Sequence, residues 1–325
     1  MSGDLGAEVV VRAAAATLQK YRNLELILVG DGDELGDLVS TIIGNDSRLR
    51  IEHASEVVEM SEAPADALRK KKDSSMRVAI NLVKEGAADA CVSAGNTGAL
   101  MATAKFVLKM LPGIDRPAII AELPAMGGTV HMLDLGANTQ ATAEQLFQYA
   151  VMGSIVAADI RGIKDPRVAL LNIGAEDTKG HDTVKEAAAV LSASTLNYVG
   201  FVEGTDLMSG KADVVVTDGF SGNVALKTIE GTVAFGKHIL ARAFKRNWIT
   251  KLQAFLASSV LRHLSAEMDS RNYNGATLAG LNGIVIKSHG SADAYAFQHA
   301  IDTAIVEVRN QLPQQIGTLL QEEAA

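Results

Sequence analysis

The stretch CVSAGNTGAL, Cys91–Leu100, passes from a β-prone apolar run into a small polar turn and then directly into a helix-forming segment. The turn contains Ser, Gly, Asn and Thr but no charged side chain. Glycines let the backbone approach a ligand closely, and the start of a helix offers free N–H groups and the positive end of its dipole. Taken alone, however, the stretch is equally typical of an ordinary turn in which Asn96 or Thr97 caps the helix.

The same order of strand, Gly/Asn-rich turn and helix recurs along the chain. Strands are expected at Leu24–Val29, Leu49–Glu52, Ala90–Ser93, Ala118–Leu123, Val130–Asp134, Val168–Asn172, Val199–Val202, Val214–Thr217 and Gly283–Ile286. Helices are expected at Glu8–Gln19, Glu34–Ile43, Ala63–Lys71, Ser74–Glu85, Thr97–Lys109, Thr139–Ala157, Thr183–Leu191, Gly222–Phe244, Trp248–Leu264 and Ala292–Gln311. This alternation predicts crossover connections, and therefore a mainly parallel sheet sandwiched by helices in a single α/β domain over residues 1–325.

Two segments depart from the alternation. Between Gly222 and about Ser270 the chain reads as two consecutive helices joined by KRNWIT, which predicts a helical hairpin protruding from the domain over residues 232–270. At the other end, MSGDLG behaves like a loop that leads into the first helix with no strand before it. A first strand is either missing from this chain or not needed by it.

Composition narrows the class of protein. The chain has 325 residues, of which 48% are hydrophobic, so it can bury a large core. A single cysteine excludes an internal disulfide framework and a cysteine-rich metal site, which favours a reduced, cytoplasmic setting. The sequence contains neither an apolar run of membrane-spanning length nor a basic-then-apolar leader. The formal net charge of −8 argues against a general nucleic-acid binder.

Small polar loops follow several of the expected strands. They are VGDGD at residues 29–33, SAGNTG at 93–98, LDLGANT at 133–139, NIGAEDTKG at 172–180, TDGFSGN at 217–223 and IKSHGS at 286–291. In an open parallel sheet such loops share the carboxyl edge, where ligands bind, so together they predict an anion pocket. We expect its walls to be formed by Ser93, Gly95, Asn96, Thr97, Gly98, Asp134, Gly136, Asn138, Gly222 and Lys287.

Each loop also has a plainer interpretation. Asp134 and Asn138 could simply cap a helix, as could Asn96. VGDGDELG superficially resembles a dinucleotide fingerprint, but its third glycine, Gly36, falls one residue too late and its acidic residues would oppose a pyrophosphate. Cys91 lies within an apolar run and is better interpreted as a packing residue than as a nucleophile.

Two loops carry charge in unusual surroundings. GAEDTKGHD, residues 174–182, places Lys179 in a glycine-flanked turn, and KSHGS places Lys287 and His289 between a strand and a helix. The chain has no Gly-x-Ser-x-Gly elbow, Walker loop or His-Glu-x-x-His motif. An enzyme without an obvious nucleophile suggests that a bound substrate supplies it. Inorganic phosphate suits this role because it is already an anion near neutral pH.

At this point the motifs match a known family. SSMRVAINLVKEGAADACVSAGNTGALMA, LDLGAN, VALLNIGAEDTKG, TDGFSGNVALKTIEG and YNGATLAGLNGIVIKSHGSA together resemble the bacterial phosphate acyltransferases of phospholipid synthesis, in the family's order and over nearly the whole chain. In that family a further strand ending in an Asp precedes the motif seen here as MSGD. This chain starts within the motif, so the resemblance marks the missing first strand as a departure.

The resemblance implies a fold like that of the isocitrate and isopropylmalate dehydrogenases and the phosphotransacetylases, assembled as a homodimer. It implies transfer of a long-chain fatty acyl group from acyl carrier protein to inorganic phosphate, without a metal, nucleotide or other cofactor. The acyl phosphate would then serve a membrane glycerol-3-phosphate acyltransferase. On this basis Lys179 is expected to pair with phosphate or the oxyanion, Asn223 to act as a neutral donor, and His289 to protonate the departing thiolate or hold phosphate.

Two basic regions are candidates for partner surfaces. RKKKDSSMR is expected to meet the acidic carrier protein through Arg69, Lys70, Lys71, Lys72 and Arg77, although a solvated helix face would look the same. In the hairpin, cations flank a set of apolar residues, and such a pattern suits contact with an anionic membrane surface. These apolar residues are Trp248, Ile249, Leu252, Phe255 and Leu256. A dimer contact or self-packed hairpin would use the same face. The expected location is therefore the cytoplasm, with peripheral association at the inner face of the cell membrane.

Two other functions remain open from the sequence. A coenzyme A-dependent phosphate acetyl- or butyryltransferase would use the same chemistry with a different thiol carrier. The other alternative is a binding protein rather than an enzyme: a non-catalytic scaffold that binds carrier protein at membranes. The missing first strand raises this alternative. The basic stretch and the hairpin favour the carrier-protein enzyme over the first alternative.

Overall fold

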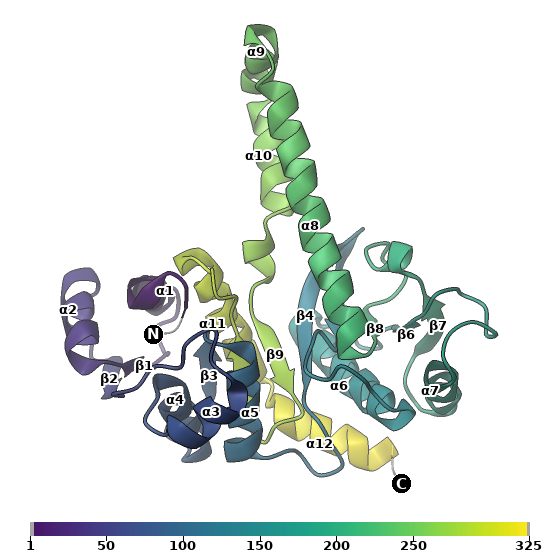
Figure 1. Cartoon of the computed structure of the whole chain (residues 1–325), viewed down its shortest axis with the longest axis horizontal. Coiled ribbons are helices and arrows are strands. Elements are labelled where there is room, and N and C mark those ends of the chain that lie inside the picture. Colours follow the sequence, from purple (N-terminus) through teal and green to yellow (C-terminus); the bar gives the residue numbers. More distant parts are fainter. Residues whose placement is uncertain (1–2, 324–325) are drawn as a thin grey trace.

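An eight-stranded sheet forms the centre of the molecule in the computed structural model, which describes residues 3–323 (Figure 1). In spatial order its strands are β3 (Ala90–Ser93), β10 (Ile284–Lys287), β9 (Ala276–Ala279), β4 (Ala118–Ala125), β5 (Gly128–Leu133), β8 (Val214–Val216), β6 (Val168–Leu171) and β7 (Tyr198–Val202). The sheet confirms the predicted α/β class. Residues 1–2 and 324–325 of the predicted domain lie outside the described residues.

The sheet consists of two parallel groups that run in opposite directions. β3 and β10 are parallel, as are β5, β8, β6 and β7, so most strand pairs are parallel as predicted. Between the groups, the β10–β9, β9–β4 and β4–β5 pairs are antiparallel. β9 was not among the predicted strands, because its sequence ATLA lacks the β-branched run that marks the others. The reversal means that the small polar loops do not share one carboxyl edge.

Helices cover both faces of the sheet. They are α3 (Pro64–Lys70), α4 (Ser75–Lys84), α5 (Thr97–Leu108), α6 (Ala143–Arg161), α7 (Asp182–Ala193), α11 (Ala294–Arg309) and α12 (Leu312–Glu323). Alternate residues of a strand enter different cores: Ile119 packs in the core shared with α4 and α5, whereas Ile120 packs in the core shared with α6, α7 and α12. This is the period of two expected for a strand buried on both faces.

A second, two-stranded sheet lies beside the first. β1 (Leu26–Gly30) and β2 (Leu49–His53) pair in parallel and are covered by α1 (Gly6–Lys20) and α2 (Gly32–Ile42). The loop at Val29 predicted to help bind an anion belongs here. Its Asp31 caps α2 by accepting from the N–H groups of Asp33 and Glu34, which is the plain role of such a turn.

The predicted hairpin projects from the body of the molecule (Figure 1). It is built from α8 (Gly219–Phe244), α9 (Trp248–Leu256) and α10 (Ser258–Glu267), with α9 across its tip. The second predicted helix is therefore interrupted at Ala257, between α9 and α10. Among residues 3–323, no helix combines the length and the apolar character needed to cross a membrane.

Candidate functional site

The loop after β5 is organised by the buried carboxylate of Asp134. One carboxylate oxygen accepts from the N–H groups of Ile119 (3.1 Å), Gly136 (3.2 Å) and Ala137 (2.9 Å). The other accepts from the N–H (2.7 Å) and the Nδ2 (3.0 Å) of Asn138. Burial raises the pKa of Asp134, while these donors lower it. The carboxylate therefore shapes the loop from within, and its two oxygens are engaged by protein donors.

The first turn of α8 is seated directly on this loop. A Cβ on Gly222 would lie 1.9 Å from the carbonyl oxygen of Asp134, and one on Gly219 would lie 2.5 Å from that of Asn138. Such distances leave room for hydrogen only, which explains the glycines in TDGFSGN. Asn138 also donates through Nδ2 to the hydroxyl of Tyr149 (2.9 Å), so the loop is fixed to α6 as well.

Beyond this contact, one face of α8 carries two further candidate site residues, Asn223 and Lys227. Gly136 has φ +123°, and a Cβ there would lie 3.4 Å from Nδ2 of Asn223. Asn223 is exposed, and Lys227, four residues later, lies on the same face of the helix. Lys227 pairs with Glu230 at 2.8 Å. It was missed by the sequence analysis, although its i+4 spacing from Asn223 is a readable signal.

The second group of site residues surrounds Lys287, at the end of β10. Its side chain is buried, and Nζ donates to the carbonyl oxygens of Ala94 (3.4 Å) and Ser288. Burial lowers the pKa of Lys287 to about 8, and the positive charge of Lys227 acts in the same direction. Asp4 opposes both effects. Lys227 belongs to the other half of the sheet, so its influence links the two groups of site residues through charge alone.

His289 follows Lys287 and has a defined proton arrangement. Its backbone N–H donates to Oδ1 of Asn274 (2.9 Å), which fixes the loop. Its ring Nδ1 accepts from the N–H of Ser291 at 3.2 Å, so a neutral ring carries its proton on Nε2. The ring is exposed at the start of the turn that leads to α11. His289 can therefore donate a hydrogen bond from Nε2.

The neighbouring strand β3 brings part of the opening stretch to the same edge as Lys287. Ser93 pairs with Lys287 in the ladder, and the Gly95 N–H donates to Oγ of Ser93 (3.2 Å). Thr97 starts α5 and is half-buried. Cys91 is buried, which raises the pKa of its thiol to about 12 and agrees with its interpretation as a packing residue.

Asn96 and Gly98 have structural roles in this loop. Oδ1 of Asn96 caps α5 by accepting from the Ala99 N–H (3.0 Å), and its Nδ2 donates to carbonyl oxygens that include that of Met60 (2.9 Å). A Cβ on Gly98 would lie 2.8 Å from Cγ of Pro64. The capping interpretation is therefore correct for Asn96, and Gly98 is required by packing against α3.

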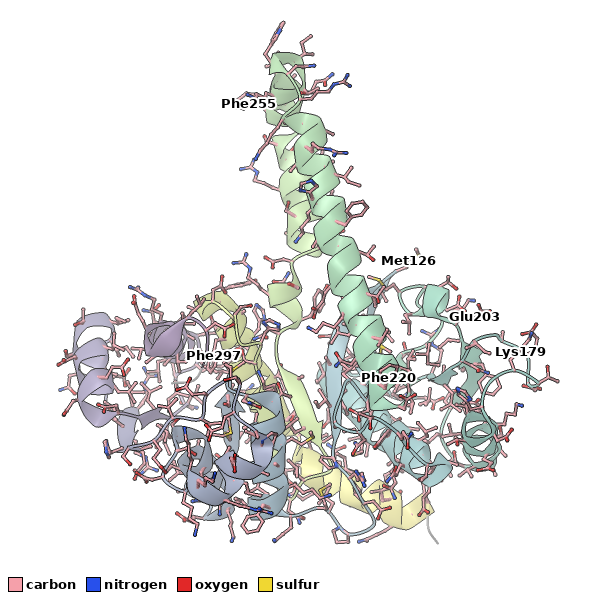
Figure 2. All side chains as sticks on the ribbon, in the orientation of Figure 1. Met126, Lys179, Glu203, Phe220, Phe255 and Phe297 are labelled. Carbon is pink, nitrogen blue, oxygen red and sulfur yellow. The ribbon has the colours of Figure 1, made fainter. Side chains whose placement is uncertain are left out.

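Lys179 lies apart from these residues. It is exposed on the loop between β6 and α7, and Figure 2 shows it on the outer side of that loop. β10 is second in the sheet and β6 is seventh, and five spacings of about 4.8 Å amount to roughly 24 Å. Within the described chain, Lys179 is not brought to Lys287 and His289. The role of Lys179 in a shared pocket stays a prediction, and the opposite strand directions show that a single carboxyl edge is not what would bring it there.

The two predicted partner surfaces are both accessible. In the first basic stretch Arg69, Lys70 and Lys72 are exposed, whereas Lys71 is held by Glu62 at 2.8 Å. Lys70 pairs with Asp66 (3.0 Å), and the Arg77 guanidinium lies 5.2 Å from the centre of the Phe106 ring.

The hairpin tip exposes large apolar side chains. The exposed fraction is 74% for Trp248, Phe255 and Leu256, and Ile249 and Leu252 are also exposed. Such a concentration of exposed apolar side chains indicates an interaction site.

Comparison with known proteins agrees with this architecture. A protein-family model described as "Fatty acid synthesis protein" matches residues 1–315. A phosphate acyltransferase of Nitrosococcus oceani is 57% identical over 322 residues, which cover 99% of this chain and 95% of that relative. A phosphate acyltransferase of Legionella pneumophila is 54% identical over 312 residues, covering 95% and 91%.

Among solved structures, a phosphotransacetylase from Streptococcus pyogenes has a TM-score of 0.63 at 22% identity, over 94% of this chain and 92% of that one. A branched-chain phosphotransacylase from Enterococcus faecalis has a TM-score of 0.59 at 15% identity, over 94% and 97%. At these identities the likeness concerns the fold, and it confirms the predicted phosphotransacetylase-like architecture. Together with the whole-length relatives, the family match shows that the chain is an acyltransferase belonging to the fatty acid synthesis protein family.

Proposed function

We propose that this chain moves a long-chain fatty acyl group from the thioester of acyl carrier protein to inorganic phosphate, producing acyl phosphate. The observation that carries the proposal is the similarity to phosphate acyltransferases at 57% identity over 99% of the chain. The buried cation Lys287 supports the phosphate part of it, because a buried cation suits a doubly charged oxyanion.

The reaction needs no nucleophile from the protein. An oxygen of phosphate forms a bond to the thioester carbonyl carbon, and the resulting oxyanion collapses with cleavage of the C–S bond. The thiolate leaves with the sulfur electron pair and takes up a proton to give the free thiol. The proton can come from the attacking hydrogen phosphate or from water, so the protein must hold phosphate and stabilise the oxyanion.

We divide these tasks among residues of the two groups described above. We assign phosphate contact to Lys287 and Lys227, and oxyanion donation to Asn223 on the same face of α8. His289 would hold an oxygen of phosphate by donating a hydrogen bond from Nε2, because its Nδ1 is already an acceptor. Lys179 is left out of this assignment, since it lies on the outer loop after β6.

Phosphate-dependent thiol release tests the function and these roles in one assay. Acyl carrier protein and acyl-coenzyme A are compared as donors for the parent chain, Lys287→Met and Lys179→Ala. We expect release from the carrier protein, a fall of about 100-fold or more in kcat/KM for Lys287→Met, and little change for Lys179→Ala. Preference for the coenzyme A donor would favour a phosphotransacetylase, and phosphate-independent or absent release would refute the proposal.

The partners follow from the same proposal. The carrier protein would dock on the exposed cations Arg69, Lys70 and Lys72, so its KM is expected to rise with salt. The acyl phosphate would pass to a membrane glycerol-3-phosphate acyltransferase. The chain would act as a homodimer, and its hairpin tip would contact the membrane surface. A KM for carrier protein that did not change with salt would argue against the basic docking surface.

A further inference from the structure

The turn between β10 and α11, residues 288–292, decides where His289 lies relative to Lys287. Its first residue, Ser288, is fully buried, and its backbone N–H donates to the carbonyl oxygen of Ser93 on β3 (2.9 Å). This bond continues the pairing of β10 with β3 by one residue. From His289 onward the turn leaves the sheet, so other contacts must fix the direction in which its ring projects.

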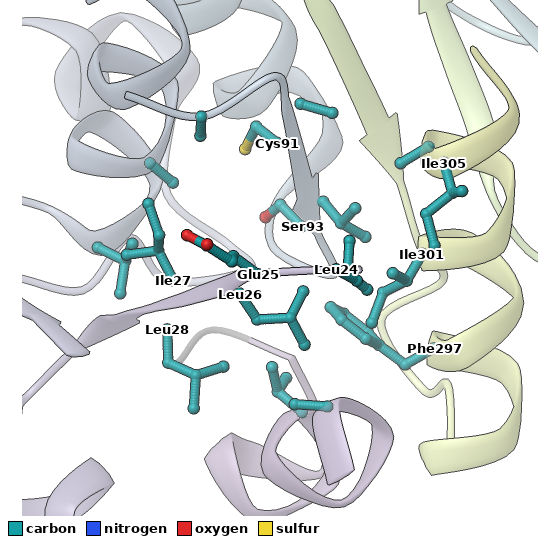
Figure 3. A pocket seen from close by; sticks show the side chains of 18 of the residues that line it. Leu24, Glu25, Leu26, Ile27, Leu28, Cys91, Ser93, Phe297, Ile301 and Ile305 are labelled. Atoms are coloured by element: carbon teal, nitrogen blue, oxygen red, sulfur yellow. The ribbon is translucent and has the colours of Figure 1, made fainter. Parts of the chain in front are cut away.

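On one side the turn borders a cavity of about 920 Å³. Gly290 and Ala292 of the turn line it, and Figure 3 shows Ser93 of β3 and Phe297 of α11 among its other lining side chains. Atoms that line a cavity lack packing partners on that side. Packing there therefore contributes little to holding the turn, and hydrogen bonds carry more of that task.

The side chain of Asn274 makes three such bonds. Asn274 directly follows the 3₁₀ helix η2 (Ser270–Tyr273), at the base of the hairpin. Its Oδ1 accepts from the backbone N–H of His289 (2.9 Å). Its Nδ2 donates to Oγ of Ser288 (2.8 Å) and to the carbonyl oxygen of Ala296 on α11 (2.7 Å). One amide thus ties the turn, through two of its residues, to the helix that follows it.

The backbone that carries Asn274 is itself fixed against α11. The next residue, Gly275, has φ +122°, and a Cβ there would lie 2.9 Å from the Cα of Ala300. Three residues before Asn274, the guanidinium of Arg271 pairs with Asp293, the N-cap residue of α11, at 2.8 Å. The amide is therefore presented to the turn from a support that is held on both sides of it in the chain.

The chemistry of the three bonds explains why the residue is an asparagine. The N–H of His289 can only donate and the carbonyl of Ala296 can only accept, so the position needs an acceptor and a donor together. An asparagine amide offers a carbonyl oxygen and two N–H donors within one short side chain. An alanine at position 274 would leave the turn with its backbone contacts alone.

We propose that Asn274 is a positioning residue, which holds the turn after β10 so that His289 contacts the phosphate bound at Lys287. The inference rests on the proposed function, in which Lys287 and His289 both hold phosphate. Asn274 does not touch the substrate in this arrangement, because it acts through the backbone N–H of His289 and the hydroxyl of Ser288. Its removal should therefore weaken phosphate binding while changing the reaction of bound phosphate little.

Asn274→Ala tests this role, with Asn272→Ala as the matched control. Asn272 lies on η2, and its side chain bonds to the hydroxyl of Tyr295 and the carbonyl oxygen of Ala266 but, within the described chain, not to the turn. In phosphate-dependent thiol release by the full chain, we expect Asn274→Ala to raise the KM for phosphate about tenfold. Its kcat and its KM for the acyl donor should stay within about twofold of the parent, and Asn272→Ala should match the parent throughout.

A double-variant cycle shows whether Asn274 acts through His289. If it does, Asn274→Ala made in a His289→Ala background should raise the KM for phosphate by less than about threefold, although each change alone raises it about tenfold. Single effects that multiplied to about 100-fold in the double variant would mean that the two residues act independently, and would overturn the proposal.

Thermal unfolding establishes that each variant is folded at the assay temperature. If Asn274→Ala does not fold, Ser288→Ala decides, because it removes only one of the three bonds; its KM for phosphate should rise about threefold, and an unchanged KM would overturn the proposal. Absence of phosphate-dependent release in the parent would refute the proposed function and this inference with it. An active parent with equal KM values for phosphate in Asn274→Ala and Asn272→Ala would refute this inference alone.

Discussion

At the scale of single residues, the carboxyl group of Glu307 is a fully buried titratable group that the proposed chemistry does not use. It is fully buried on α11, where one oxygen accepts from Oγ1 of Thr277 on β9. Burial raises the pKa of Glu307 to about 8, and the negative charge of Asp159 on α6 adds to the effect. At neutral pH the group is therefore a protonated acid inside the core.

This acid makes stability depend on pH in a predictable direction. The folded chain holds the proton up to about pH 8, whereas the unfolded chain releases it near 4.5, so stability decreases as pH rises through this window. The stabilising contribution of the protonated Glu307 is fully present below pH 4.5 and absent above pH 8. Glu307→Gln removes the titration, so its stability relative to the parent, measured by urea unfolding, should improve from pH 6 to pH 9. A constant difference across that range would contradict the prediction.

Lys227 can be tested through its effect on Lys287. Removing its charge in Lys227→Met should raise the pKa of Lys287, because the neighbouring positive charge lowers it. If both lysines hold phosphate, the KM for phosphate should rise about tenfold or more, with a smaller effect on the KM for the acyl donor. Lys237→Met, which removes the same charge farther along α8, is the matched control. Equal KM values for phosphate in the two variants would exclude Lys227 from the site.

At the scale of elements, close backbone contacts locate α8. Gly222→Ala places a Cβ 1.9 Å from the carbonyl oxygen of Asp134, so the helix or the loop must move. We expect a loss of about 1–3 kcal/mol in the free energy of unfolding. Gly231→Ala, on the same helix with nothing within 4 Å, should gain up to about 1 kcal/mol. Urea unfolding of the pair checks this, and similar stabilities would mean that the contact is looser than described.

Most elements were predictable because their sequences carry strong local signals. β3 was predicted at its observed bounds, Ala90–Ser93, from an apolar run that stops at a polar turn. β9 was not predicted, since ATLA between glycines has neither alternation nor β-branched enrichment, and only pairing with β4 and β10 makes it a strand. Local pattern thus defined most helices and strands, although α12 was not predicted, and strand direction depended on a segment without local signal.

At the scale of the whole molecule, that undetected strand decides how the site is assembled. The antiparallel connections through β9 and β4 reverse the second half of the sheet, so loops that look alike in sequence point to opposite edges. Lys287 ends β10 and His289 lies two residues beyond it, so their closeness could be read from sequence. Lys179 could not be placed relative to them from sequence, and the charge of Lys227, on α8, acts on Lys287 from the other half of the sheet.

The hairpin provides the test at this scale. Its tip presents Trp248, Phe255 and Leu256 at 74% exposure, next to cations of the same segment. Such a surface is expected to insert at the interface of an anionic bilayer. Trp248→Asp should therefore lower binding to phosphatidylglycerol-containing vesicles about tenfold or more in a flotation assay. Phe106→Asp, which places the same charge at an exposed aromatic position on α5, should float like the parent. If Trp248→Asp also floated like the parent, the prediction of membrane contact would be wrong, and the apolar tip would be a protein contact instead. If that contact joins two copies of this chain, Trp248→Asp should also lose the dimer.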